Sequence, residues 1–336
     1  MELATRYMGL ELRNPLVASA SPLSYTLEGI RRLADAGVGA VVLFSLFEEQ
    51  VRAQAVQNAE LVDTPAESFG EALDYLPAVA KEDPGPSGYL RLLEEAAATA
   101  GVPVIASLNG VTPGGWTQYA RAMQDAGAVA IELNVYYLPA SPQTPAREVE
   151  QRHVEVLEHV KAAVSVPVAV KLGPWFSSPA EMALRLDKAG ADALVLFNRF
   201  LQPDIDPETL TVTPTVTLSS RAEARLPRAW IALLRGRVHA ALAATTGVEE
   251  PADLAAYLLA GADVVMSASA LLRHGPEHAR VLLDGLTAWM EAKGFDAVDE
   301  FRGKLAVRRG ADESALERAG YVSALRAANA GAYALR

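Results

Sequence analysis

The chain alternates short apolar runs with longer segments in which apolar residues recur every three or four positions. The short runs are typical of strands buried on both faces of a parallel sheet, and the longer segments are typical of amphipathic helices. Strands that alternate with helices of this length predict repeated βαβ units. The predicted strands span residues 15–19, 39–44, 102–107, 128–134, 166–172, 192–198, 238–245 and 262–267.

The predicted helices span residues 26–36, 89–100, 116–126, 146–164, 179–189, 221–235, 250–260 and 276–293. Four of them end in an Ala-Gly pair, at Gly37, Gly127, Gly190 and Gly261. Glycine favours the left-handed conformation that closes many helices. This repeated strand–helix unit favours a closed (β/α)8 barrel over an open sheet. No linker divides the chain, so we expect a single domain over residues 1–336.

Two longer segments, 45–88 and 199–220, interrupt the alternation. The second contains an alternating Thr/Val pattern at 211–217, which predicts a small hairpin. Both segments follow a strand, so both would lie on the C-terminal face of a barrel, where the active sites of such folds are found. We expect them to cover a ligand there.

The composition excludes several classes of function. The formal charge of −11 and the pI of about 5.1 disfavour binding to nucleic acid or to an anionic membrane surface. The chain has no cysteine, which excludes disulfides, thiolate metal sites and a cysteine nucleophile. The histidines have no spacing that would gather a third ligand, so we predict no metal site. Without a signal pattern or an apolar run of about 18 residues, we expect a cytoplasmic protein.

Polar residues end three of the predicted buried strands. Asn134, Lys171 and Asn198 lie at or near the C-terminal ends of these strands. Burial of an amide or an ammonium group is unfavourable unless the group has a partner, and this end of a barrel is its catalytic face. A lysine can also extend to solvent, and an asparagine can also cap a loop. We favour a site role for all three residues.

The order of motifs resembles that of class 1 dihydroorotate dehydrogenases. The matching segments are Asn-Pro-Leu-Val-Ala-Ser at 14–19, Glu-Leu-Asn at 132–134, Val-Ala-Val-Lys-Leu at 168–172, Gly-Ala-Asp-Val-Val at 261–265, and 293–305. The resemblance runs from about residue 5 to about residue 306. It implies an FMN-binding barrel that oxidises the CH–CH bond of a dihydropyrimidine-like ring, as in pyrimidine metabolism.

The resemblance also implies roles for individual residues. Lys171 would contact the flavin near N1 and the C2 oxygen, Asn134 the flavin or the substrate, and Asn198 the substrate ring. The residues implied for the cofactor are Ser19, Ala20 and Ser45 along the isoalloxazine, and Thr246, Gly247, Ala268 and Ser269 around the phosphate. A plain helix cap at Thr246-Gly247 would have the same geometry as a phosphate site.

Several positions depart from the pattern of this family. Tyr137 stands where the family has a Cys or Ser base, and tyrosine, with a usual pKa of about 10, is a poor base at neutral pH. Phe44 replaces a lysine, and Glu67 replaces an asparagine that binds the substrate. Tyr137 is therefore either a proton-transfer residue or part of a pocket wall, and Glu67 either faces the substrate or lies on the surface. We predict little oxidation of dihydroorotate itself.

Three functions remain open at this point. The favoured one is an FMN-dependent oxidoreductase, expected as a homodimer, which passes electrons to a small molecule, a quinone-like acceptor or a partner redox protein. The second is an aldolase-type barrel in which Lys171 forms a Schiff base. The third is an inactive barrel that serves as a subunit of a larger redox complex. Visible flavin absorbance in the purified protein would separate the first from the other two.

Overall fold

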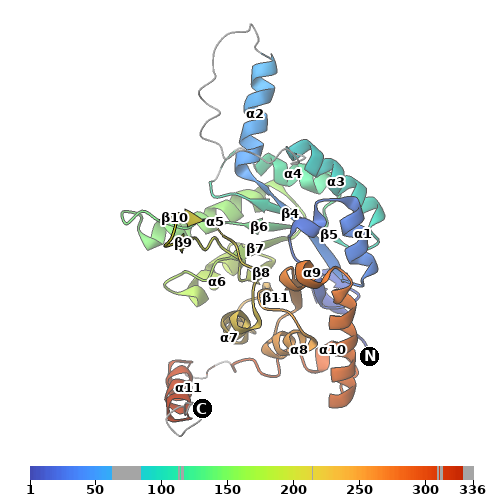
Figure 1. Ribbon diagram of the computed structural model, residues 1–336, viewed down its shortest axis with the longest axis vertical. Coiled ribbons are helices and arrows are strands. Elements are labelled where there is room, and N and C mark those ends of the chain that lie inside the picture. Colours follow the sequence, from blue (N-terminus) through green and yellow to red (C-terminus); the bar gives the residue numbers. More distant parts are fainter. Residues whose placement is uncertain are drawn as a thin grey trace.

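A closed barrel of eight parallel strands forms the centre of the molecule, with helices around its outside (Figure 1). The computed structural model describes residues 1–62, 85–112, 114, 117–213, 215–308, 310 and 313–327. The barrel strands are β3 (Leu16–Ala18), β4 (Ala40–Phe47), β5 (Val104–Asn109), β6 (Ala130–Asn134), β7 (Val168–Leu172), β8 (Ala193–Leu196), β11 (Ala241–Ala244) and β12 (Val264–Ser267). Each predicted strand is found, and the predicted (β/α)8 fold is confirmed.

The helices of the structure also match the predicted ones. They are α1 (Leu27–Asp35), α2 (Glu48–Val62), α3 (Gly85–Thr99), α4 (Thr117–Asp125), α5 (Ala146–Ala163), α6 (Pro179–Lys188), α7 (Arg225–Leu234), α8 (Pro251–Ala260), α9 (Ser269–His274), α10 (His278–Lys293) and α11 (Glu313–Ala327). Short 3-10 turns are η1 (Pro22–Ser24), η2 (Arg221–Ala224) and η3 (Val298–Glu300). The pattern did not predict α2, α9 or α11, and η2 and α7 together form the helix predicted at 221–235.

Burial explains why the apolar runs form strands. Every residue of β5, β6 and β7 is buried, because the barrel interior covers one face and the helices cover the other. The interior is filled by side chains such as Val42, Ile105 and Val195. The hairpin of β1 (Thr5–Tyr7) and β2 (Leu10–Leu12) packs Tyr7 and Leu12 against the same interior cluster. The barrel is thus a packed core, closed at its N-terminal end.

The four Ala-Gly pairs end helices as predicted. Gly37, Gly127, Gly190 and Gly261 all have positive φ angles, between 93° and 118°. A residue with a Cβ atom would be strained in this conformation. The sequence signal therefore marked real helix ends.

The two insertions lie at the C-terminal ends of their strands. The second contains a hairpin, in which β9 (Asp204–Asp206) pairs with β10 (Thr211–Thr213). The hairpin predicted within 211–217 was placed too late in the chain, because only 211–213 is a strand and its partner precedes it. In the first, β4 continues to Phe47 and leads into α2, which extends away from the barrel (Figure 1). Among the described residues, no helix has the length and apolar character needed to cross a bilayer.

Candidate active site

A cavity of about 190 Å³ opens at the C-terminal end of the barrel. It is lined by the loops after β3, β8, β11 and β12 and by the end of the second insertion, at 216–219, which has no regular secondary structure. Most of the predicted site residues meet there, namely Ser19, Ala20, Lys171, Asn198, Thr246, Gly247, Ala268 and Ser269. The structure therefore gathers residues that are up to 250 positions apart in the sequence, Ser19 and Ser269, around one cavity.

Lys171 is held at the base of this cavity by a buried ion pair. Its Nζ atom lies 3.1 Å from Oε1 of Glu132 and 3.3 Å from Oγ of Ser19. The two charged side chains are only 8% and 1% exposed. Because its carboxylate is almost completely buried, Glu132 depends on Lys171 for charge compensation.

Glu132 belongs to the Glu-Leu-Asn segment at 132–134, but the sequence did not predict it as a site residue. The available signal was its position two residues before Asn134 on a buried strand, which places both side chains on one face. Its second oxygen, Oε2, has no hydrogen-bond partner among the described residues, and neither has the hydroxyl of Tyr7 below it. Burial, together with the charges of Glu132 and Asp263, raises the pKa of Tyr7 well above its usual value.

Three asparagine side chains lie at or just after the C-terminal ends of β5, β6 and β8. Nδ2 of Asn198 donates to Oδ1 of Asn134 at 3.0 Å, which joins the loop after β8 to the end of β6. Asn109 ends β5 in register with Asn134 and is also buried. Asn109 was missed because the predicted strand stopped two residues too early. Together the amides offer donors and acceptors suited to a ring with carbonyl and N–H groups.

The loops predicted to bind phosphate are linked by a residue that was not predicted. Ser219 accepts from the backbone N–H of Gly247 at 3.1 Å through its Oγ atom. Its own N–H donates to Oγ of Ser269 at 3.0 Å, and the two hydroxyls are also 3.0 Å apart. The second insertion thus carries hydroxyl and amide donors to the end of the cavity where the resemblance places a phosphate.

Gly247 is required by the packing of the protein itself. Its φ is +69°, and a Cβ atom there would lie 2.7 Å from the carbonyl oxygen of Ser220 and 2.9 Å from Ala224. Thr246 also has a positive φ, of 82°, although it is not a glycine. The conformation of this loop is therefore set by its contacts with η2.

Phe44 occupies an aromatic stack where the resemblance implies a lysine. Its ring stacks on Tyr25 with centroids 4.1 Å apart and meets the edge of Tyr89 at 5.0 Å. Next to it, Oγ of Ser45 is 2.8 Å from Oγ of Ser107, between β4 and β5. Ser45 does not line the cavity of Lys171. Glu67 lies outside the described residues.

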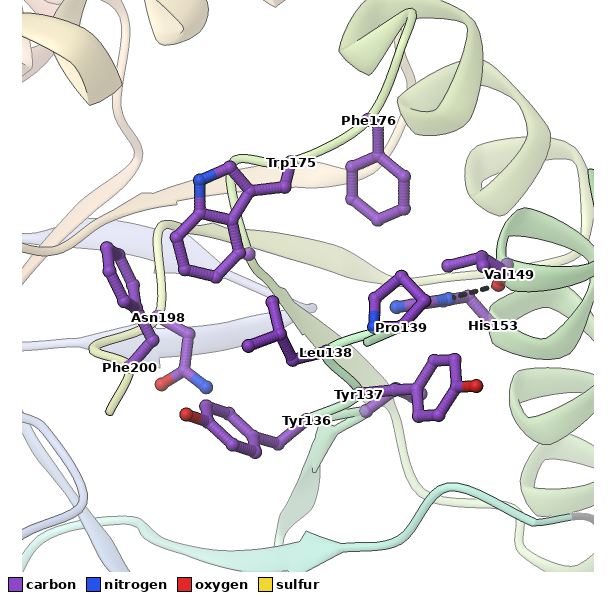
Figure 2. Close-up of a pocket in the computed structure, with 12 residues that line it drawn as sticks. Tyr136, Tyr137, Leu138, Pro139, Val149, His153, Trp175, Phe176, Asn198 and Phe200 are labelled. Atoms are coloured by element: carbon purple, nitrogen blue, oxygen red, sulfur yellow. Dashed lines mark hydrogen bonds between the residues drawn. The ribbon is translucent and has the colours of Figure 1, made fainter. Parts of the chain in front are cut away.

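A second, aromatic pocket adjoins the cavity (Figure 2). We call it the aromatic pocket; it is lined by Val135, Tyr136, Tyr137, Leu138, Pro139, Val149, His153, Gly173, Trp175, Phe176, Asn198 and Phe200. Asn198 lines both this pocket and the cavity of Lys171.

The two tyrosines of the aromatic pocket point in opposite directions. Tyr136 points to the side of Asn198 and Tyr137 to the opposite side (Figure 2). The hydroxyl of Tyr136 accepts from the N–H of Leu201 at 2.7 Å. The guanidinium of Arg152 lies 4.2 Å from the ring centre of Tyr137, a cation–π contact. Tyr137 therefore lies in a pocket wall and is directed toward α5.

Comparison of the sequence with known proteins identifies the family of this chain. The model of a family described as dihydroorotate dehydrogenase matches residues 2–290. The chain belongs to the dihydroorotate dehydrogenase family. Membership confirms the predicted family and the predicted class of enzyme, an oxidoreductase.

Curated members of the dihydroorotate dehydrogenase family align over most of this chain. A protein from Methanothermobacter thermautotrophicus is 29% identical over 313 residues, which cover 90% of this chain and 97% of the relative. One from Methanosarcina acetivorans is 28% identical and covers 88% and 93%, and one from Methanocella arvoryzae is 34% identical and covers 62% and 66%. All three are named catalytic subunits of dihydroorotate dehydrogenase B (NAD(+)).

Proposed function

We propose that this protein is an FMN-dependent oxidoreductase that removes two hydrogens from the CH–CH bond of a reduced, dihydropyrimidine-like ring. The observation that carries the proposal is the position of Lys171, which is buried at the base of the cavity with Ser19 and faces the two loops after β11 and β12. A fixed cation at one end and hydroxyl and amide donors at the other suit a flavin ring and a phosphate.

The residues of the cavity have separate tasks in this proposal. FMN, when bound, would supply the hydride acceptor. Lys171 would stabilise the negative charge that develops near N1 and the C2 oxygen, and a single preorganised donor of this kind contributes about 3 kcal/mol. Asn134 and Asn198 would hold the substrate ring, while Ser219 and Ser269 lie where the phosphate would bind. Glu132 would hold the Lys171 side chain in position.

We further propose that dihydroorotate is a poor substrate. The aromatic stack around Phe44 supplies no cation for a substrate carboxylate. Two cationic side chains that do line the cavity, Lys171 and Arg199, are paired with Glu132 and Glu223. Tyr137 would line the pocket and take no part in proton transfer, because its ring is directed toward Arg152.

The absorbance spectrum of the purified protein tests the cofactor. We expect the visible absorbance of a bound flavin, and mass spectrometry of the released cofactor should identify FMN. A colourless protein that binds no added FMN would refute the proposal and favour an inactive barrel subunit. Trapping of a carbonyl substrate on Lys171 by borohydride would instead favour an aldolase-type barrel. A lysine paired with a carboxylate, as Lys171 is, is a poor nucleophile.

Anaerobic mixing with reduced rings tests the substrate. We expect dihydroorotate at about 1 mM, the upper end of usual KM values, to bleach the flavin slowly or not at all. Rapid bleaching by dihydroorotate that is lost in Tyr137→Phe would show that Tyr137 is a base after all.

The electrons must leave through an acceptor that the sequence does not identify. Because three relatives are named catalytic subunits, we propose that a partner redox protein accepts them here as well. A partner co-purifying with the natural protein and reoxidising its flavin would support this proposal. Rapid reoxidation by a small quinone alone would contradict it.

We also propose a homodimer formed through the β9–β10 hairpin. Ile205, Leu210 and Val212 on this hairpin are 72%, 87% and 65% exposed, an apolar patch that a second copy could cover. Light scattering should give twice the mass of 35.7 kDa, and Leu210→Ser should shift the protein toward the monomer. A monomeric parent protein would refute the proposal.

A further inference from the structure

The aromatic pocket offers an apolar surface next to the substrate-binding amides. Trp175 and Phe200 meet edge to face with their ring centroids 3.9 Å apart, and Leu138 and Tyr136 lie opposite them (Figure 2). The pocket has a volume of about 40 Å³, which is room for about three water molecules or part of one ring. Trp175 and Leu138 are 51% and 55% exposed, so a ligand could cover them.

No charged side chain among the described residues offers a counter-ion to an anion in this pocket. None of the described residues that line it is Asp, Glu, Lys or Arg. His153 is 3% exposed, and its burial lowers its pKa, so its imidazole is neutral at neutral pH. Arg152 contacts the ring of Tyr137, but it does not line the pocket.

Asn198 connects the pocket to the proposed reaction centre. Its side chain is bonded to Asn134 and borders both the cavity of Lys171 and the aromatic pocket. A ring held by these two amides would therefore direct one of its substituents toward Trp175 and Phe200. This step rests on the proposed function, because that function places the ring at the two amides.

We infer that the natural substrate of this enzyme carries an uncharged apolar substituent, no larger than one ring, part of which enters the pocket between Trp175, Phe200 and Leu138. A carboxylate placed there would lose its hydration without gaining a cation. An apolar ring would instead remove the exposed surfaces of Trp175 and Leu138 from water and could stack on the aromatic side chains. The pocket thus selects for apolar substituents and against the carboxylate of dihydroorotate.

Three uracil derivatives that differ only at C6 provide the test. They are uracil, orotate, which carries a carboxylate at C6, and 6-phenyluracil, which carries an apolar ring there. Titration calorimetry on the protein as purified should give at least tenfold tighter binding of 6-phenyluracil than of either other ligand. Equal or tighter binding of orotate, or no binding of 6-phenyluracil, would overturn the inference.

Variants of the pocket wall test whether a preference for 6-phenyluracil comes from the aromatic pocket. Trp175→Ala should weaken the binding of 6-phenyluracil at least fivefold and leave that of uracil unchanged, while Trp175→Phe should retain most of the affinity. Tyr321→Ala is the matched control, because Tyr321 is an exposed aromatic residue on α11 that does not line the pocket. Unchanged binding of 6-phenyluracil in Trp175→Ala would refute the assigned position.

The flavin content of the same samples separates this inference from the proposed function. Protein without flavin that still prefers 6-phenyluracil, with the preference lost in Trp175→Ala, would refute the proposed function and leave the pocket assignment standing. Protein that holds FMN but prefers orotate would refute the pocket assignment alone.

Discussion

Replacement of Lys171 by methionine should destabilise the protein even when no cofactor is present. The substitution roughly keeps the length of the side chain. It removes the cation that pairs with Glu132, whose carboxylate is 1% exposed. Removal of one partner from a buried ion pair typically costs 3–5 kcal/mol, because the remaining charge stays buried without compensation. We therefore expect Lys171→Met to lower the free energy of unfolding by about 3 kcal/mol.

The reverse substitution should be milder. Glu132→Gln leaves an ammonium group that still contacts Ser19 and borders the open cavity, so it should lose about 1–2 kcal/mol. The double variant Lys171→Met/Glu132→Gln removes both charges and should lose less than Lys171→Met alone. This order, with the lysine variant the least stable of the three, is specific to a buried acid that depends on one cation.

Urea unfolding of flavin-free protein, followed by far-UV circular dichroism, measures these differences. Absence of the cofactor matters, because a ligand bound only by the folded state would add its own stabilisation. A Lys171→Met variant within about 0.5 kcal/mol of the parent, or a double variant whose loss equals the sum of the single losses, would refute the reasoning. Lys171 would then act on the cofactor alone.

Three further outcomes are expected. Gly247→Ala should lower the free energy of unfolding, measured with denaturant, by about 1–3 kcal/mol more than Gly9→Ala does. Both glycines have positive φ, but of the two only Gly247 would bring a Cβ atom against backbone, at 2.7 Å. Equal losses in the two variants would contradict this. Burial lowers the pKa of the His153 imidazole below its usual 6.5. As the pH falls below 6.5, the unfolded chain therefore binds a proton at His153 before the folded protein does, and the folded state loses stability. His153→Gln should reduce the fall in Tm between pH 7 and pH 5, whereas exposed His159→Gln should not. Tyr137→Phe should leave flavin reduction by an accepted substrate unchanged within about twofold, and loss of reduction would make its hydroxyl catalytic.

The sequence by itself determined the architecture. Each strand and each Ala-Gly helix end depends on residues that are close in the chain, and periodicity and glycine conformation act over that range. The same local pattern also located Lys171 and Asn134, because a parallel barrel brings the C-terminal ends of its strands to one face. In the second insertion the alternating pattern located one strand of the hairpin, β10, and missed its partner β9.

Only the tertiary structure decided which groups meet at that face. The pairing of Lys171 with Glu132 depends on the register of β6 against β7. The hydrogen bonds that join Ser219 to Gly247 and Ser269 depend on how the second insertion returns to the barrel. The opposite directions of Tyr136 and Tyr137 follow from contacts with Leu201 and Arg152 on other elements. Such contacts join residues that closure of the barrel brings together, so no local pattern in the sequence specifies them.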